Sequence, residues 1–220
     1  MLVAGVDEAG RGAVIGPLVI AGVLVKEEDL PRLREIGVKD SKLLSPHTRE
    51  TLATEIKRIA QNYNIEKLQP REIDIAVRSG RKLHKLNRLE AQTMAKVIEA
   101  LRPDRVYVDA SDVLEERFKQ HILECMQFRV KIISEHKADR NHVAVSAASI
   151  VAKVERDREI AQLANAYGDF GSGYPSDPRT AAFLKECCEK SGEYPDFVRK
   201  SWKPAKKAKD EKGSHQAKLI

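Results

Sequence analysis

The 220-residue chain is 42% hydrophobic and 33% charged, a composition that can bury one substantial core. Its apolar runs are shorter than the ~20 residues that cross a bilayer. Its three cysteines, two of them adjacent, suggest neither a disulfide framework nor a zinc site. We therefore expect a cytoplasmic, monomeric protein that makes no membrane contact. The net charge of +6 lies mostly in residues 203–220, which hold six lysines and two acidic residues, so charge argues only weakly for a polyanionic partner.

The first third of the chain predicts three strands. Two β-branched apolar runs, Leu2–Asp7 and Pro17–Val25, are joined by the glycine-rich AGRGAVIG and predict an antiparallel hairpin. The elements predicted after the hairpin are a short helix at 27–37, a helix from Pro46 to about Gln61 with Ser45 as its N-cap, and a third strand over Tyr63–Leu68.

The rest of the chain alternates helices with strands. β-branched runs predict strands at 105–110 and 128–136. Apolar periodicity predicts helices over Pro70–Arg78, Lys85–Leu101, Val113–Leu123, Val143–Ala164, Thr180–Lys190 and Tyr194–Lys200. This order predicts an α/β fold, a mixed five-stranded sheet flanked by helices, with C-terminal helices. We expect one domain over 1–202, followed at 203–220 by a basic tail whose composition favours disorder.

Acidic residues stand where predicted strands end. LVAGVDE ends on Asp7 and Glu8, and RVYVDA ends next to Asp109. In EHKADRNH, Asp139 lies between a strand and the helix that begins near Val143. A single acid at a strand end more often caps a turn or faces solvent. If these strands are neighbours, however, four carboxylates converge and repel one another unless hard cations neutralise them, and oxygen ligands suit Mg²⁺ or Mn²⁺.

Asp7 and Glu8 pose a geometric problem, because adjacent residues of a regular strand point to opposite faces of a sheet. We therefore expect a bulge or the end of the strand to turn one of them into the site. Alternatively, Glu8 turns inward only at the loop that follows.

Five ordered motifs resemble ribonuclease HII, the type 2 ribonuclease H, and in particular its archaeal members. They are GVDEAGRG, VKDSKLL, VYVDA, EHKAD followed by VSAASIVAKVERDRE, and FGSGYPSDP, and the resemblance runs from Val3 to about Trp202. It implies a ribonuclease H-like fold. It also implies an endoribonuclease that cleaves the RNA strand of RNA–DNA hybrids and nicks duplex DNA 5′ to an embedded ribonucleotide, leaving 3′-hydroxyl and 5′-phosphate ends.

The resemblance assigns catalysis and metal binding to Asp7, Glu8, Asp109 and Asp139. Hydrolysis of a phosphodiester needs an activated water and a stabilised leaving oxygen, which two divalent ions provide. Asp7 and Asp109 are expected as central ligands, and Asp139 as the outer, more mobile ligand that also helps the product leave. The nearby His136 and His142 are not expected as ligands, because Mg²⁺ avoids imidazole.

The resemblance also implies contacts to the substrate, an RNA–DNA hybrid or a duplex DNA that contains a ribonucleotide. The loop GRG would read the 2′-hydroxyl, an aromatic residue would stack beside the scissile phosphate, and polar residues of VKDSKLL would hold the backbone. Plain alternatives are a hairpin turn, a surface-packed tyrosine and a polar loop. The residues assigned to substrate binding are Gly10, Arg11, Gly12, Lys39, Ser41, Lys42 and Tyr174. Lys153, Arg156 and Arg158 on the long helix form either a basic edge or an ordinary exposed face.

Two alternative functions are weighed against this one. A ribonuclease HIII typically carries an additional N-terminal domain that is not expected here. A non-catalytic hybrid-binding module of the same fold is disfavoured, because all four acids are present. In the tail, the lysines predict a sequence-independent phosphate tether. Gln216, Leu219 and Ile220 match the first half of a sliding-clamp motif found in some archaeal relatives but lack its aromatic residues, so weak clamp contact is the less favoured alternative.

Overall fold

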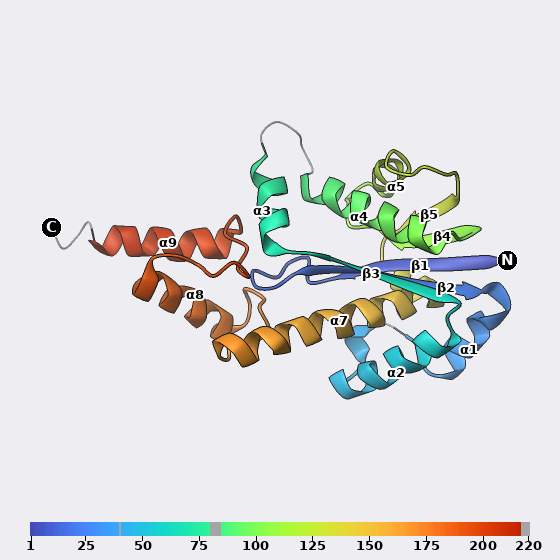
Figure 1. Cartoon of the computed structure of the whole chain (residues 1–220), viewed down its shortest axis with the longest axis horizontal. Coiled ribbons are helices and arrows are strands. Elements are labelled where there is room, and N and C mark those ends of the chain that lie inside the picture. Colours follow the sequence, from blue (N-terminus) through green and yellow to red (C-terminus); the bar gives the residue numbers. More distant parts are fainter. Residues whose placement is uncertain (40, 80–84, 217–220) are drawn as a thin grey trace. The chain divides into compact units, whose positions relative to one another are not determined.

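The computed structural model describes residues 1–39, 41–79 and 85–216, with the last six described by their backbone alone (Figure 1). The chain folds as two compact units. Unit 1 comprises Met1–Ala9, Val19–Lys67 and Leu83–Glu155, and unit 2 comprises Gly10–Leu18, Leu68–Lys82 and Arg156–Ile220. Within the described ranges, none of the helices is long and apolar enough to span a bilayer.

The strands and helices follow the predicted order. The strands are β1 (Leu2–Ala9), β2 (Leu18–Lys26), β3 (Asn62–Leu68), β4 (Arg105–Asp109) and β5 (Lys131–Glu135). The helices are α1 (Leu30–Glu35), α2 (Pro46–Ile59), α3 (Pro70–Arg78), α4 (Lys85–Leu101), α5 (Glu115–Leu123), α6 (Ala138–Asn141), α7 (Val143–Tyr167), α8 (Pro178–Ser191) and α9 (Lys203–Gln216), with 3₁₀ turns η1 (Glu27–Asp29) and η2 (Ser41–Leu43). Ser45 caps α2 as predicted, because its side chain accepts a hydrogen bond from the Thr48 amide at 3.1 Å.

The sheet is mixed and has the strand order β3-β2-β1-β4-β5, which confirms the predicted fold class. β1 is antiparallel to β2 and parallel to β4, and β4 is parallel to β5. β1 and β2 are buried along almost their whole length, which explains why the sequence shows continuous apolar runs there and no alternation. The parallel pairing brings the carboxyl ends of β1 and β4 to the same edge of the sheet.

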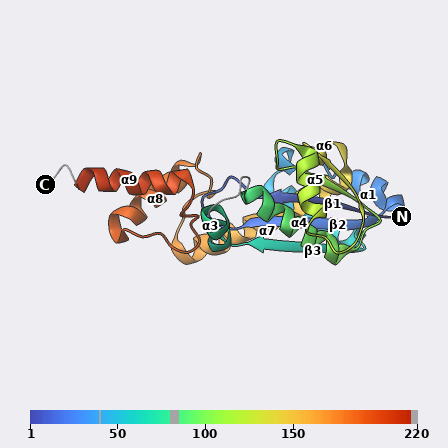
Figure 2. The ribbon, with the colours of Figure 1, turned by 90° about the horizontal axis from the view of Figure 1, so that it is seen from above.

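Helices cover both faces of the sheet of unit 1 (Figures 1 and 2). On one face, an apolar cluster joins β2 to α1, α2 and the first half of α7 through residues such as Leu33, Ile56 and Val151. A Cβ on Gly5 of β1 would lie 2.1 Å from the carbonyl carbon of Ala144, so α7 reaches the sheet only because this position is glycine. α4 and α5 pack together on the opposite face.

The predicted helix over Tyr194–Lys200 is wrong. Val198 instead forms a β-bridge with Ile15, the Gly16 amide donates to the Phe197 carbonyl at 2.9 Å, and the Arg199 amide donates to the Val14 carbonyl at 2.8 Å. The backbone groups that a helix would have used are therefore paired with a segment far away in the sequence. The same segment adds Phe197 and Val198 to the apolar cluster of unit 2.

Residues 203–216 form helix α9, whereas the sequence analysis expected disorder from Lys203 onward. Ala205 is fully buried, and the Tyr194 hydroxyl donates a 2.8 Å hydrogen bond to its carbonyl. Disorder was expected from the lysine content, but apolar packing on one side of the helix outweighs that composition. The residues matched to the clamp motif have no described side chains, and Leu219 and Ile220 lie outside the described residues.

Candidate active site

β1 presents two carboxylates on opposite faces of the sheet. The strand pairs with β2 in regular register through Ala9, so the described strand has no bulge, which was one of the ways in which the sequence analysis expected an acid to be reoriented. Asp7 is 4% exposed and hydrogen-bonds Ser149 of α7. Glu8 accepts a 3.0 Å hydrogen bond from the hydroxyl of Ser111, two residues beyond the end of β4. Normal strand alternation is therefore kept, and Glu8 is oriented by the loop after the neighbouring strand.

Asp109 ends β4 and is held by the turn before α6. The Ala138 amide donates to its Oδ1 at 3.0 Å. Lys137 precedes α6 in the left-handed backbone region, with φ of 56°, and its amide also hydrogen-bonds Asp109. Asp139 follows on α6 and is 3% exposed, and its carbonyl accepts a 2.5 Å hydrogen bond from the Ser146 hydroxyl. The turn thus connects Asp109 and Asp139, the last two acids of the predicted set.

Burial and neighbouring carboxylates raise the pKa values of two acids of this site. Burial raises the pKa of Asp7 well above its usual range, and the charge of Asp109 raises it further. Burial also raises the pKa of Asp109, and Asp139 adds to the rise, while hydrogen bonds from the α6 turn and the charge of Lys42 oppose it. Burial and like charge together therefore outweigh the effects of the nearby cation and hydrogen-bond donors on Asp7 and Asp109.

The donor set of this site fits a hard divalent cation. Within the described ranges, no three His, Cys, Asp or Glu side chains are gathered closely enough to form a ready-made metal site. The available donors are nevertheless carboxylate oxygens, the ligands that Mg²⁺ and Mn²⁺ prefer. A bound cation would relieve the repulsion that raises the pKa values of Asp7 and Asp109.

The residues of VKDSKLL have different environments. Lys42 acts electrostatically on Asp109. Lys39 is exposed and lines an open pocket of about 570 Å³ together with Arg34, Arg140 and Asp139.

Ser41 does not fit the substrate contact that the resemblance implies. It is 4% exposed, and its hydroxyl forms a 3.0 Å hydrogen bond with the Ser149 hydroxyl. Because Ser149 also hydrogen-bonds Asp7, Ser41 contacts that carboxylate indirectly, through Ser149. Arg49, which the sequence analysis missed, fixes this turn by donating to the carbonyls of Ser41 at 3.2 Å and Leu44 at 2.7 Å. The available signal in the sequence was that Arg49 lies on the otherwise apolar, buried face of α2.

The two histidines beside Asp139 have hydrogen-bond partners of their own. His142 bonds the Glu135 carboxylate at 3.0 Å and stacks on Tyr107 with ring centroids 4.1 Å apart. His136 lies 3.3 Å from the carbonyl oxygens of Ala110 and Val113 through its two ring nitrogens. Both rings therefore bind groups around the site.

The GRG loop belongs to unit 2. Gly10 has φ of 88°, and a Cβ there would lie 2.8 Å from the Pro17 carbonyl oxygen, so the turn requires glycine. Gly12 is exposed, and its nearest neighbour in space is Tyr174, whose Cε1 would lie 4.0 Å from an added Cβ. Arg11, between them, is half-buried. The loop and the predicted stacking tyrosine therefore face each other.

Arg199 holds the GRG loop and was missed by the sequence analysis. It is fully buried and donates to the backbone carbonyls of Gly10 at 2.8 Å, Arg11 at 2.8 Å and Gly16 at 3.1 Å. Trp202 stacks on its guanidinium at 5.1 Å. The three hydrogen bonds to backbone carbonyls span more than 180 residues of sequence, so no local pattern could reveal them.

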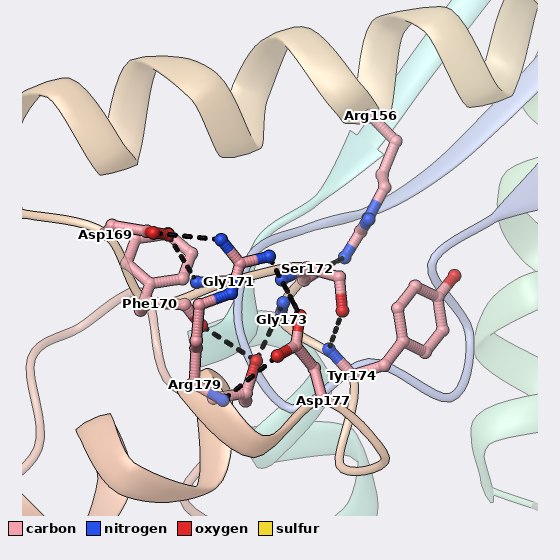
Figure 3. A network of polar contacts seen from close by, with 10 residues as sticks. Arg156, Asp169, Phe170, Gly171, Ser172, Gly173, Tyr174, Asp177 and Arg179 are labelled. Atoms are coloured by element: carbon pink, nitrogen blue, oxygen red, sulfur yellow. Dashed lines mark hydrogen bonds and ion pairs between the residues drawn. The ribbon is translucent and has the colours of Figure 1, made fainter. Parts of the chain in front are cut away.

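The loop GSGYPSDP is ordered by Asp177, the N-cap of α8 (Figure 3). Its carboxylate accepts hydrogen bonds from the amides of Ser172 at 2.7 Å and Arg179 at 3.0 Å. These bonds lower the pKa of Asp177 to about 2. Tyr174 is half-buried within this loop.

Comparisons with known proteins agree with the motifs. The family model described as Ribonuclease HII matches residues 4–205. Ribonuclease HII from Thermococcus onnurineus is 51% identical over 96% of this chain and 91% of its own length. The crystal structure of ribonuclease H2 from Pyrococcus horikoshii superposes with a TM-score of 0.88, at 46% identity over 96% of this chain and 98% of that one.

A further solved structure, the PCNA:RNase HII complex from Archaeoglobus fulgidus, matches with a TM-score of 0.83 at 46% identity, over 92% of this chain and 96% of that one. A match over nearly the whole chain at this identity shows the family. The chain belongs to the ribonuclease HII family, nucleases that cut the RNA strand of RNA–DNA hybrids.

Proposed function

We propose that this nuclease, with residues 1–202 as its catalytic domain, also nicks duplex DNA 5′ to a single embedded ribonucleotide. It hydrolyses the phosphodiester with two divalent ions and leaves 3′-hydroxyl and 5′-phosphate ends. The observation that carries the proposal is the buried Asp7 at the end of β1, whose pKa is raised by burial and by the charge of Asp109 at the end of β4, in a chain of this family. Charged carboxylates in such an environment lower the stability of the fold unless a bound cation neutralises them.

Asp7, Glu8, Asp109 and Asp139 would hold Mg²⁺ or Mn²⁺. Bound ions would activate a water and stabilise the leaving oxygen. Ser149 and the Ala138 amide orient the central pair, Asp7 and Asp109, through hydrogen bonds seen in the structure. Asp139 takes the outer position, beside the open pocket that it shares with Lys39.

Recognition of the substrate falls to the GRG loop, Tyr174 and two lysines. The exposed backbone at Gly12 and the facing ring of Tyr174 suit a ribose and its base, because a 2′-hydroxyl both donates and accepts hydrogen bonds. Arg11 contacts a phosphate from the same loop. Lys39 and Lys42 hold the sugar-phosphate backbone without reading bases, so cutting is independent of sequence.

A digest of end-labelled duplexes tests this function. The substrate is duplex DNA with one ribonucleotide, and the control is the same duplex made entirely of DNA. We expect one nick 5′ to the ribonucleotide in Mg²⁺ or Mn²⁺, none in the control and none with EDTA. Binding of the ribonucleotide duplex without cleavage under any metal would favour the non-catalytic hybrid-binding module.

For the tail, we infer a phosphate tether. Lys203, Lys206 and Lys209 are exposed on α9 and can reach phosphates without base contacts. Binding to a sliding clamp is the alternative, because the similar ribonuclease HII from Archaeoglobus fulgidus was solved in a complex with PCNA. Titration of the peptide 203–220 against the sliding clamp of the same organism separates the two. Micromolar affinity that is lost on Gln216→Ala would replace the tether by a clamp contact, and no binding would support the tether.

A further inference from the structure

Arg156 of α7 is a buried cation with an unusual set of neighbours (Figure 3). It is 2% exposed, and its guanidinium carbon lies 4.6 Å from the ring centroid of Tyr174. One terminal nitrogen donates to the Ser172 carbonyl at 2.6 Å, and the other lies 3.6 Å from the Asp157 carboxylate. Nε has no hydrogen-bond partner within the described residues. Arg156 therefore belongs to neither of the exposed surfaces considered for it from the sequence.

Burying this guanidinium is unfavourable, and its surroundings offset the cost only in part. Desolvation lowers the pKa of Arg156, and the nearby Asp157 and Tyr174 oppose that change. A leucine or methionine would fill the same volume without leaving a donor unpaired. The position is therefore explained better by what the guanidinium contacts than by fold stability.

Two glycines make room for Arg156 between the loops of the proposed recognition site. A Cβ on Gly10 would lie 3.3 Å from its Cγ and Nε, and a Cβ on Gly173 would lie 3.1 Å from Nη2. The side chain thus lies against the GRG loop and the GSGYP loop at once. Tyr174 has the guanidinium at its ring and Gly12 at its Cε1 edge.

We propose that Arg156 is a positioning residue that fixes the ring of Tyr174 against the GRG loop and thereby sets the selectivity for a single ribonucleotide in DNA. The inference rests on the proposed recognition function of Tyr174. A planar cation over an aromatic ring, hydrogen-bonded to the loop that carries that ring, restricts both the ring and its backbone. The nucleotide then meets a preordered surface.

The test is a double-mutant cycle of Arg156→Gln and Tyr174→Leu. kcat and KM are measured on duplex DNA with one ribonucleotide and on an RNA–DNA hybrid. We expect Arg156→Gln to lower kcat/KM on the single-ribonucleotide duplex about tenfold, mostly through kcat, and to affect the hybrid less, because many ribonucleotides offer alternative registers. In the Tyr174→Leu background, the same change costs less than twofold.

Arg179→Gln is the matched control. Arg179 binds the same loop through Asp169 at 2.9 Å and Asp177 at 3.6 Å but does not contact Tyr174 in the network drawn in Figure 3. If loosening the loop were sufficient, Arg179→Gln would change the ratio of the two kcat/KM values as much as Arg156→Gln does. We expect that ratio to change less than twofold.

Three outcomes contradict the inference in distinguishable ways. If the two losses multiply, Arg156 does not act through Tyr174. If Tyr174→Leu leaves cleavage of the single-ribonucleotide duplex unchanged, the recognition function of Tyr174 fails, and the inference fails with it. If Arg179→Gln matches Arg156→Gln, the effect is general loop stability. Should Arg156→Gln fail to fold in thermal melts, the cycle is run with Arg156→Lys, which keeps the charge, and the same criteria apply to an expected loss of about threefold.

Discussion

Asp7 and Asp112 are two buried carboxylates of unit 1, 4% and 1% exposed, with pKa values shifted in opposite directions. Burial raises the pKa of Asp7, and another carboxylate, Asp109, raises it further. Burial alone would also raise the pKa of Asp112. Hydrogen bonds from Arg117, from Asn87 at 2.8 Å and from the Leu114 amide at 3.0 Å reverse this effect and hold the pKa well below its usual range.

The difference shows that burial alone does not decide the pKa of a carboxylate, and that the charges and hydrogen-bond donors around it do. Asp112 accepts hydrogen bonds from a cation and from two other donors, so its charge is already neutralised and the group orders the loop after β4. Asp7 has hydrogen bonds from Ser149 and the Glu8 amide, but the charges of Asp109 and Glu8 both raise its pKa. Like charge therefore acts on both Asp7 and Asp109, which supports the metal site proposed for the ends of β1 and β4.

The largest effect should come from Asp7→Asn. Because asparagine keeps the shape but removes the charge that would attract the metal in the proposed site, we expect kcat/KM on an RNA–DNA hybrid to fall at least ~10³-fold, equivalent to about 4 kcal/mol of barrier. Hybrid binding measured in EDTA should stay within about twofold. Turnover close to that of the unchanged enzyme would remove Asp7 from the metal site.

Tyr174→Ala sharpens the comparison, because it removes the aromatic ring proposed to recognise the substrate and leaves the carboxylates unchanged. Loss of stacking costs ~1–3 kcal/mol per base, so we expect cleavage at a lone ribonucleotide to fall roughly 10- to 100-fold. Binding to all-DNA duplex should change little. Equal losses in the two assays would show that Tyr174 serves only to stabilise its loop.

Asp112→Asn should have the opposite pattern to Asp7→Asn. Removing the charge leaves Arg117 short of its partner, so we expect a loss of about 2 kcal/mol in the free energy of unfolding, while cleavage stays within about threefold. Urea titrations and the hybrid assay measure the two quantities. A large loss of cleavage in a protein with unchanged stability would place Asp112 in the active site.

The pH dependence of stability should differ in sign between the two carboxylates. The pKa of Asp112 is lowered on folding, so its contribution is present above the unfolded value of ~3.9 and is lost as the pH falls below that value. The pKa of Asp7 is raised on folding, so in the metal-free protein this group lowers the free energy of unfolding increasingly as the pH rises above ~3.9. In EDTA, Asp7→Asn should therefore gain stability over the unchanged protein between pH 4 and pH 7. A gain that shrinks as the pH rises would contradict the raised pKa.

The smallest effect belongs to α9. Deleting residues 203–220 would also remove the buried Ala205, so the better variant replaces Lys203, Lys206 and Lys209 by glutamine. If these lysines tether phosphates, binding to duplex weakens severalfold at low salt, and the slope of log K against log [salt] falls by about 0.9 for each lost contact. An unchanged slope would leave α9 without a role in binding.

Much of the fold can be read from local patterns. The runs around Val3 and Val23 predicted the central strands, and Ser45 marked the start of α2, because these features depend on neighbouring residues only. The acids at the strand ends could also be found, since parallel strands bring their ends to one edge. The sequence did not reveal that Ser41 is buried or that the segment around Val198 pairs with Ile15.

The buried arginines show why the rest could not be predicted. Arg156 and Arg199 look like surface cations in the sequence, yet they lie under the GRG loop, with donors aimed at backbone carbonyls. A backbone carbonyl carries no sequence signature, and its partner can stand anywhere along the chain. The same reason hid Arg49 and the packing of α9.

Calorimetric titration of Mn²⁺ tests the central claim most directly. The metal-free enzyme, Asp7→Asn and Asp112→Asn are titrated under the same conditions at pH 7. Because the charges found to act on Asp7 within the described residues are carboxylates, whereas Asp112 binds Arg117, we predict that Asp112→Asn binds Mn²⁺ as the unchanged enzyme does and that Asp7→Asn loses at least tenfold in affinity. Equal Mn²⁺ affinity in all three proteins, or a loss confined to Asp112→Asn, would contradict the account.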